Sequence, residues 1–157
     1  MMNPSQNLRN SFYFKKILKF CSLNIRSYTE ISTKLEKFDR LELELKREII
    51  EYFLKIKVVL NDDDFVKYYL ENLSDSQGYT YNQLFLKLSK KVSNLNNLSQ
   101  DLKSFFSKTE DDQIQKFINK NYRKLSRIDD ARKRIQYLTN RGFKFELVKK
   151  HLKINDL

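Results

Sequence analysis

Residues that turn a β-hairpin are nearly missing from this chain. Its 157 residues include two glycines and one proline, and neither Asn-Gly nor Asp-Gly occurs. Tight hairpin turns depend on such residues because few others adopt the required backbone torsions. Leu, Lys, Ile and Glu are abundant instead, which is typical of helical proteins. The sequence therefore predicts an all-α fold.

The composition also excludes several broad classes of protein. Hydrophobic residues make up 40% of the chain and charged residues 32%, which favours a packed core over disorder. No apolar run approaches the ~18 residues of a membrane-spanning helix, and we expect a cytoplasmic protein. The first 29 residues contain no acid and weakly resemble a mitochondrial transit peptide, an alternative to a first helix. Cys21 is the single cysteine, so no intrachain disulfide forms, and its apolar neighbours predict a buried thiol.

The positive charge is large and uneven. The formal net charge is +11. Residues 1–60 carry twelve bases and seven acids, residues 61–107 five and six, and residues 108–157 fourteen and seven. Such a field favours polyanionic partners, including nucleic acid and nucleoprotein. The alternative is the codon bias of an AT-rich genome, because the chain is rich in Lys, Asn, Ile, Tyr and Phe.

A capped helix start at residues 26–38 sets the pattern for the rest of the chain. Ser27 can accept a hydrogen bond from the first free amides, and Glu30 can reach back to the cap, which together form a capping box. Ile31, Leu35 and Phe38 then share one helical face. The segment predicts a turn followed by an amphipathic helix.

Later segments repeat this plan. Thr80 is expected to cap a helix bearing Leu84 and Leu88, and Ser126 a helix bearing Ile135 and Leu138 that Gly142 ends. Further helix starts are expected at Asn61, before three acids, and at Thr109, before Glu110, Asp111 and Asp112.

The recurring plan predicts nine helices in a tandem array of three three-helix, helix-turn-helix-like modules, elongated in shape. The expected divisions are a flexible N-terminus at 1–10 and modules at 11–60, 61–108 and 109–157. An array of this kind without a catalytic constellation typically presents a surface to a partner.

Residues for catalysis or metal binding do not form a recognisable set. His151, the only histidine, is expected to be solvated at a helix end. The acids Asp62–Asp64 fit a helix start better than a calcium loop, since adjacent helical residues point in different directions. No P-loop, dinucleotide fingerprint or zinc spacing occurs. We therefore expect a protein that is not an enzyme, with no cofactor and no metal.

Four motifs in order resemble the RecX regulatory proteins, over about Phe14 to Lys153. They are an Arg-Ser helix start, an acidic run before Phe, a glycine loop with two leucines, and Arg-Gly-Phe. The matching residues are Arg26-Ser27, Glu30-Ile31, Lys34-Leu35, Asn61–Val66, Gly78, Leu84, Leu88, Leu138 and Arg141-Gly142-Phe143. Two departures are Lys91-Val92, where the family often has Lys-Gly, and Lys144, where it commonly has Ser.

The resemblance implies a non-enzymatic regulator that binds the RecA recombinase and its filament on single-stranded DNA. Such regulators restrain the ATPase, strand-exchange and co-protease activities of RecA in homologous recombination, DNA repair and the SOS response. We expect a monomer without a membrane partner, and weak direct DNA binding as a further option. The alternatives are a basic helical nucleic-acid-binding protein, or a helical adaptor, with no RecA role.

Six basic residues are candidates for partner contact because they lie nearest the repeated middle helices and their turns. They are Arg26, Lys34, Lys87, Lys90, Arg141 and Lys144. The alternative for each is a solvated charge with no partner.

Overall fold

The computed structural model describes residues 8, 10–73 and 77–153, so most of the predicted flexible N-terminus and Ser74–Ser76 of one predicted loop lie outside the described residues. Within these ranges the chain forms nine helices and two strands of two residues each. This confirms the all-α prediction. The elements are α2 (Phe12–Cys21), β1 (Arg26–Ser27), α3 (Tyr28–Glu36), α4 (Leu43–Lys55), β2 (Val59–Leu60), α5 (Asp62–Glu71), α6 (Tyr81–Leu88), α7 (Leu95–Lys120), α8 (Tyr122–Ser126), α9 (Ala131–Thr139) and α10 (Phe145–Leu152).

The chain divides into two compact units. Unit 1 comprises Met1–Tyr69 and Ser89–Leu98, and unit 2 comprises Leu70–Leu88 and Ser99–Leu157. Among the described residues, no helix combines the length and the apolar character that crossing a bilayer requires.

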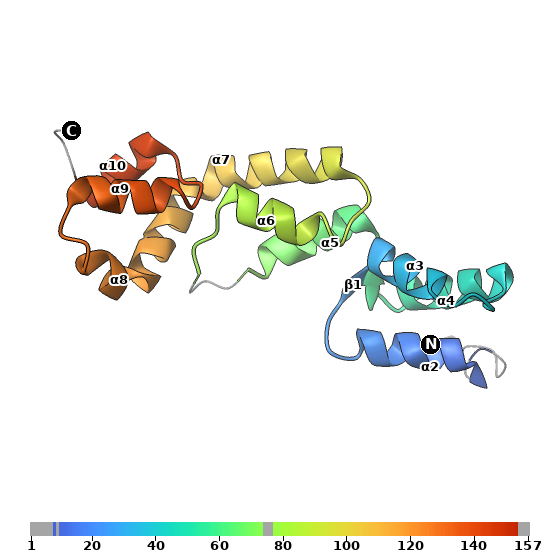
Figure 1. Cartoon of the computed structure of the whole chain (residues 1–157). Helices are drawn as coiled ribbons and strands as arrows, with labels where there is room; N and C mark the ends of the chain where they lie inside the picture. The colour runs from blue at the N-terminus through green and yellow to red at the C-terminus, as the bar shows by residue number, and fades with distance from the viewer. Residues whose placement is uncertain (1–7, 9, 74–76, 154–157) are drawn as a thin grey trace. The chain divides into compact units, whose positions relative to one another are not determined.

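Unit 1 is built on an apolar core shared by α2, α3 and α4, which lie side by side in Figure 1. Ile17, Ile31 and Phe53 are fully buried there. Cys21 is also buried, as predicted. Burial is the main cause that raises the pKa of its thiol to about 11, with Glu30 adding to the rise and Arg26 opposing it. The thiol therefore stays protonated and packs as a small apolar group.

Two short strands in unit 1 were not predicted. β1 pairs with β2 in parallel, with Arg26 opposite Val59 and Ser27 opposite Leu60. Strands of two residues are too short to show the alternation of apolar and polar residues by which strands are recognised. The pairing holds the residues before α3 beside the residues before α5.

Unit 2 has its own core at the junction of α7, α9 and α10. Ile114 from α7, Leu138 from α9 and Val148 from α10 are fully buried in it. Figure 1 shows α9 and α10 lying against each other. Phe117 lies three residues after Ile114, and Ile135 three residues before Leu138, so α7 and α9 each turn one apolar face to this core.

The expected helix start at Thr109 is wrong, because α7 runs without a break from Leu95 to Lys120. The Thr109 hydroxyl donates to the Phe105 carbonyl oxygen at 2.9 Å, a bond made within the helix. The acids that follow form ion pairs, Glu110 with Lys144 and Asp111 with Lys150, each at 2.6 Å. They therefore neutralise bases on the segment that carries α10 and do not mark a helix start. The expected module boundary at 108/109 falls inside this helix, and the three-module division stays a prediction.

The expected cap at Ser126 is also wrong. Ser126 ends α8, and its hydroxyl donates back to the Arg123 carbonyl oxygen at 3.1 Å. Asp130 caps α9 instead, accepting a hydrogen bond from the Arg132 amide at 2.8 Å. An aspartate forms this cap well, and Asp130 lies directly before the first helical residue.

The predicted ending of this helix at Gly142 is confirmed. Gly142 has a φ of 101°, a conformation that residues with a Cβ resist. Its amide donates to the Thr139 carbonyl oxygen at 2.9 Å, and the Phe143 amide donates to the Leu138 carbonyl oxygen at 3.4 Å. These two bonds together form a Schellman motif.

Gly78 is required for a different reason. A Cβ at this position would overlap the Gln113 carbonyl oxygen and the Phe117 amide nitrogen of α7. The Tyr79 amide donates to the side-chain oxygen of the buried Gln113 at 2.9 Å, which holds the loop against the helix. The loop backbone can approach α7 this closely only because position 78 has no side chain.

Candidate partner-binding surface

The start of α3 forms a polar hub within unit 1, made by Ser27, Glu30, Asp62 and Lys91. The predicted capping box is confirmed, since the Glu30 amide donates to the Ser27 hydroxyl at 3.1 Å and the Ser27 amide donates to the Glu30 carboxylate at 3.2 Å. The fully buried Ser27 hydroxyl also donates to the Lys91 carbonyl oxygen. The Lys91 ammonium pairs with Glu30 at 2.6 Å. The capping box therefore also anchors the segment that precedes α7.

Asp62 completes the polar hub, a role that the sequence reasoning missed. Its carboxylate accepts from the amide and hydroxyl of Thr29 at 3.0 and 2.6 Å. It also accepts from the amide and hydroxyl of Ser93 at 2.8 and 2.9 Å. Burial, the largest influence, raises the pKa of this carboxyl, but the four hydrogen bonds together lower it below its usual value. No local pattern signals this role, because Thr29 and Ser93 lie 33 and 31 residues away along the chain.

Arg26 and Lys34, two predicted contact residues in unit 1, both lie over the ring of Phe20. The Arg26 guanidinium is 4.1 Å from the ring centre, and its Nε donates to the Phe20 carbonyl oxygen at 3.2 Å. Arg26 also pairs with Glu30 at 3.4 Å, and its side chain is only 19% exposed. The Lys34 ammonium is 5.2 Å from the Phe20 ring centre. The described contacts of Arg26 are thus internal. Of the three candidates in this unit, Arg26 and Lys34 are half-buried and Lys90 is exposed.

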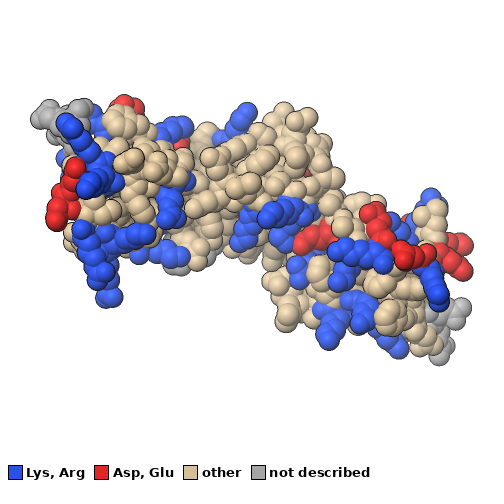
Figure 2. All heavy atoms as spheres, in the orientation of Figure 1, with Lys and Arg blue, Asp and Glu red and all other residues tan. Residues whose placement is uncertain are grey.

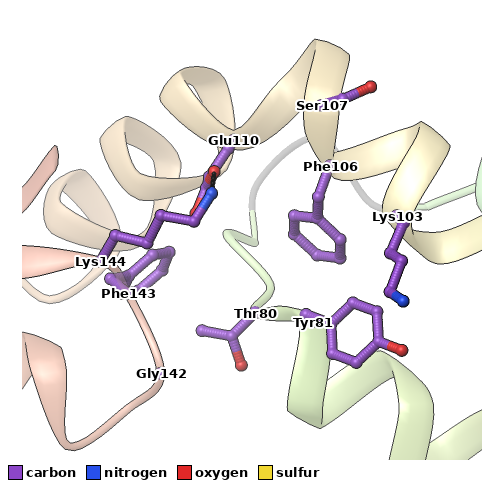
Figure 3. A pocket seen from close by; sticks show the side chains of 9 residues that line it. All are labelled: Thr80, Tyr81, Lys103, Phe106, Ser107, Glu110, Gly142, Phe143 and Lys144. Carbon is purple, nitrogen blue, oxygen red and sulfur yellow. Dashed lines mark hydrogen bonds and ion pairs between the residues drawn. The ribbon is translucent and has the colours of Figure 1, made fainter. Parts of the chain in front are cut away.

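Unit 2 contains two hollows that include the other three candidates. The first, here called the aromatic hollow, has a volume of about 350 Å³. Figure 3 shows rings of Tyr81 from α6, Phe106 from α7 and Phe143 from the segment before α10 around it. The ring centres of Tyr81 and Phe106 are 6.2 Å apart, and the Tyr81 hydroxyl bonds the Ser99 hydroxyl at 2.9 Å. The aromatic walls are therefore fixed in place by contacts within the unit.

Charged side chains border the aromatic hollow. Lys144 reaches across to Glu110, with 2.6 Å between the ammonium and the carboxylate (Figure 3). Its side chain is nevertheless 74% exposed, so the pair is open to water. Lys103 lines the same hollow and is exposed. The border thus combines one exposed ion pair with one further cation, an arrangement suited to a partner segment that carries both an apolar and an acidic side chain.

The second hollow, here called the basic hollow, has a volume of about 260 Å³. Its lining brings together the predicted residues Lys87 and Arg141 with Lys120, which the sequence reasoning did not select. Three cations line it, and no carboxylate side chain does. The Arg141 guanidinium lies 5.0 Å from the Tyr137 ring centre. In Figure 2, Lys and Arg side chains gather over α8, which follows the end of α7 that forms one wall.

His151 is not the solvated side chain that was expected. Only 14% of its side chain is exposed. Its Nε2 lies 2.9 Å from the Asp111 carboxylate, and its Nδ1 lies 3.1 Å from the Gln115 side-chain oxygen. The two hydrogen bonds from Lys150 and His151 are the leading causes that lower the pKa of Asp111. His151 therefore joins α10 to α7. Among residues 8, 10–73 and 77–153, no three potential ligands gather into a metal site.

A solved structure gives the comparison for this fold. The chain is similar to the crystal structure of RecX from Lactobacillus salivarius, with 23% identity and a TM-score of 0.64. The match covers 90% of this chain and 92% of that one. The two proteins share a fold. No protein-family model matches the chain. No curated protein matches it either.

Proposed function

We propose that this protein is a non-enzymatic regulator of the RecA recombinase. The observation that carries the proposal is the fold shared with the RecX structure over nine-tenths of both chains. The four motifs that resemble RecX proteins support it independently, because they occur in the same order along the chain. The regulator binds RecA on single-stranded DNA and restrains its ATPase, strand-exchange and co-protease activities in recombination and SOS repair.

The aromatic hollow is the part of unit 2 that best suits a protein partner. Rigid aromatic walls that can enclose one apolar side chain are typical of the positions that dominate binding energy. The cations at its border, Lys103 and Lys144, favour an acidic segment and increase the rate of encounter. We place the contact with RecA here, with an apolar side chain of RecA in the hollow and an acidic one beside Lys103.

The proposal is tested by measuring the ATPase activity of RecA on single-stranded DNA with substoichiometric amounts of this protein. We expect the ATPase to fall. An unchanged rate at physiological salt contradicts the proposal. The location is tested with Lys103→Glu combined with Lys144→Glu, against Lys108→Glu combined with Arg40→Glu as a control with the same change in net charge.

Lys108 and Arg40 are exposed and line neither hollow. Reversal of Lys103 and Lys144 should abolish most of the inhibition, since two repulsive charges then face an acidic segment. Circular dichroism should show the same helix content for both variants. Equal inhibition by the two variants would remove the aromatic hollow from the proposed contact and leave the regulatory role itself intact.

A further inference from the structure

The basic hollow of unit 2 has the properties of a phosphate-binding site. Its cations come from different elements: Lys87 from α6, Lys120 from the end of α7, and Arg141 from the segment after α9. Side chains from segments this far apart in sequence converge only because the fold brings them together. A concave site with three cations and no lining carboxylate concentrates positive potential, which attracts anions.

Two of these cations are not neutralised by the protein. Among the described residues, neither Lys120 nor Arg141 forms an ion pair. Their positions contrast with Lys144 and Lys150 in the same unit, which pair with Glu110 and Asp111 at 2.6 Å. An unpaired guanidinium gains more from a phosphate than a paired one, because no internal contact has to be broken first.

The hollow also offers orientation and neutral hydrogen-bonding groups. Tyr137 lies under both Arg141, at 5.0 Å, and Lys124, at 4.8 Å from the ring centre. This ring limits the positions that the guanidinium can take, which reduces the entropy lost on binding. The side-chain amides of Gln77 and Gln83 line the same hollow and can donate to phosphate oxygens.

We propose that the basic hollow binds a phosphate group of a nucleic-acid backbone, with Arg141 and Lys120 as its main contacts and Lys87 as a third cation. This goes beyond the proposed regulation of RecA and does not depend on it. The rings that line the hollow are those of Phe117, which is buried, and Tyr79, which is half-buried, so we assign recognition to the phosphate and not to base stacking. Small phosphorylated anions share this chemistry, and the experiment separates the two sources.

The test uses the full chain and no RecA. Binding of a fluorescein-labelled oligo-dT is measured by anisotropy over a range of NaCl concentrations, for the wild type, for Lys120→Ala combined with Arg141→Ala, and for Lys108→Ala combined with Arg40→Ala. All three proteins are first compared by circular dichroism and thermal melting. The two variants lose the same net charge, so a difference between them reports position and not total charge.

The slope of log K against log salt is negative. Removing two phosphate contacts should make it less steep by about 1.4, since each contact to a single strand contributes about 0.7. We expect about tenfold weaker binding at low salt for the Lys120/Arg141 variant and less than about twofold for the control. Equal losses in both variants, or an unchanged slope, would overturn the assignment of the hollow to a nucleic-acid strand. A lower melting temperature with an unchanged slope would show that these cations serve only the helix ends that carry them, and would also overturn it.

The source of the phosphate is decided by a second arm with pyrophosphate as the probe. Shifts of the Gly78 and Tyr79 amide signals in NMR spectra are followed on titration, because both residues line the hollow. Oligo-dT binding with the expected slope change assigns the hollow to a nucleic-acid strand. Saturable pyrophosphate shifts that vanish in the Lys120/Arg141 variant, without that slope change, assign it to a small phosphorylated anion. A response to neither probe overturns the site.

Discussion

The two units use the same kind of helix start in opposite ways. In unit 1, the charges around the Ser27 capping box are bound internally: Glu30 pairs with Lys91 and Arg26. In unit 2, the corresponding box is made by Thr80 and Gln83, whose amides donate to each other's side chains at 3.1 and 3.3 Å. A neutral glutamine replaces the glutamate there, so it binds no cation strongly. Two cations of unit 2, Lys120 and Arg141, form no ion pair among the described residues and line the basic hollow.

This contrast shows how a repeated local structure can serve either stability or binding. A charged residue in a hydrogen-bonded network resists change, because removing one partner leaves the others unsatisfied. A charge beside an open hollow contributes little to stability. We therefore expect substitutions in the polar hub of unit 1 to affect folding and substitutions in the basic hollow of unit 2 to affect binding.

Gly78→Ala should cause the largest loss of stability, about 3 kcal/mol. The added Cβ overlaps backbone atoms of α7, which cannot move aside as a flexible side chain would. Urea unfolding followed by circular dichroism measures the change. Gly142→Ala is the control, since a Cβ there would make only ordinary contacts, at 3.5 Å from Thr80, and the positive φ alone opposes it, at a cost of about 1 kcal/mol. Equal losses at the two glycines would show that the loop is not held against α7.

Asp62→Ala should destabilise the protein by about 2 kcal/mol, because four hydrogen bonds to Thr29 and Ser93 are lost and the partly buried Thr29 donors are left without an acceptor. Asp63→Ala removes a neighbouring acid from the same helix start and should cost under about 1 kcal/mol. Asp63 has one long contact, 3.4 Å to Asn97. Urea unfolding of the two single variants measures both losses in stability. Similar losses for both would mean that Asp62 acts only through the helix dipole.

The pH dependence of stability should identify Asp62 separately. Its pKa is lowered in the folded protein from the usual 3.8, so its stabilisation is fully present above that value. The stabilisation is lost as the pH falls through the folded pKa. The difference in unfolding free energy between the wild type and Asp62→Asn should therefore be largest at neutral pH and shrink below pH about 3.8. A constant difference across this range would exclude a charged carboxylate as the acceptor.

The long-range hydrogen bonds of Asp62 also show what the sequence could and could not predict. Capping at Ser27, Asn61 and Thr80 was predicted correctly, because the groups involved lie within four residues of each other. The break at Thr109 was predicted wrongly, because its acids resemble a helix start but find partners 34 and 39 residues away. Long-range pairing of this kind leaves no local pattern.

The candidate surface was predictable only in part, because its residues come together through contacts that are distant in the sequence. Lys87 and Arg141 were selected from their places beside the repeated helices, and both line the basic hollow. Lys120 was missed because it ends a helix whose length was not foreseen. Tyr81 and Phe106 have the spacing of core residues, and spacing alone does not distinguish a core ring from one that lines a hollow.

The two capping boxes offer a more direct comparison of the units. Ser27→Ala should cost about 2 kcal/mol, since the hydroxyl both caps α3 and donates to the Lys91 carbonyl oxygen. Thr80→Ala removes a cap of the same type and should cost about 1 kcal/mol. Urea unfolding of the two single variants measures the difference. A larger loss at Thr80 would reverse the proposed division between a stabilising and a binding unit.

The smallest expected effects concern the two arginines that lie over aromatic rings. Arg26→Ala should cost about 1 kcal/mol, because its side chain is only 19% exposed and the Phe20 carbonyl oxygen and Glu30 lose a donor. Arg141→Ala should change stability by less than about 0.5 kcal/mol, since this exposed residue has a ring contact and no ion pair among the described residues. Thermal melting at low and high salt distinguishes the two arginines, because salt screening weakens the ion pair between Arg26 and Glu30. If Arg141→Ala destabilised the chain as much as Arg26→Ala, Arg141 would be a structural residue and would not be available for a phosphate.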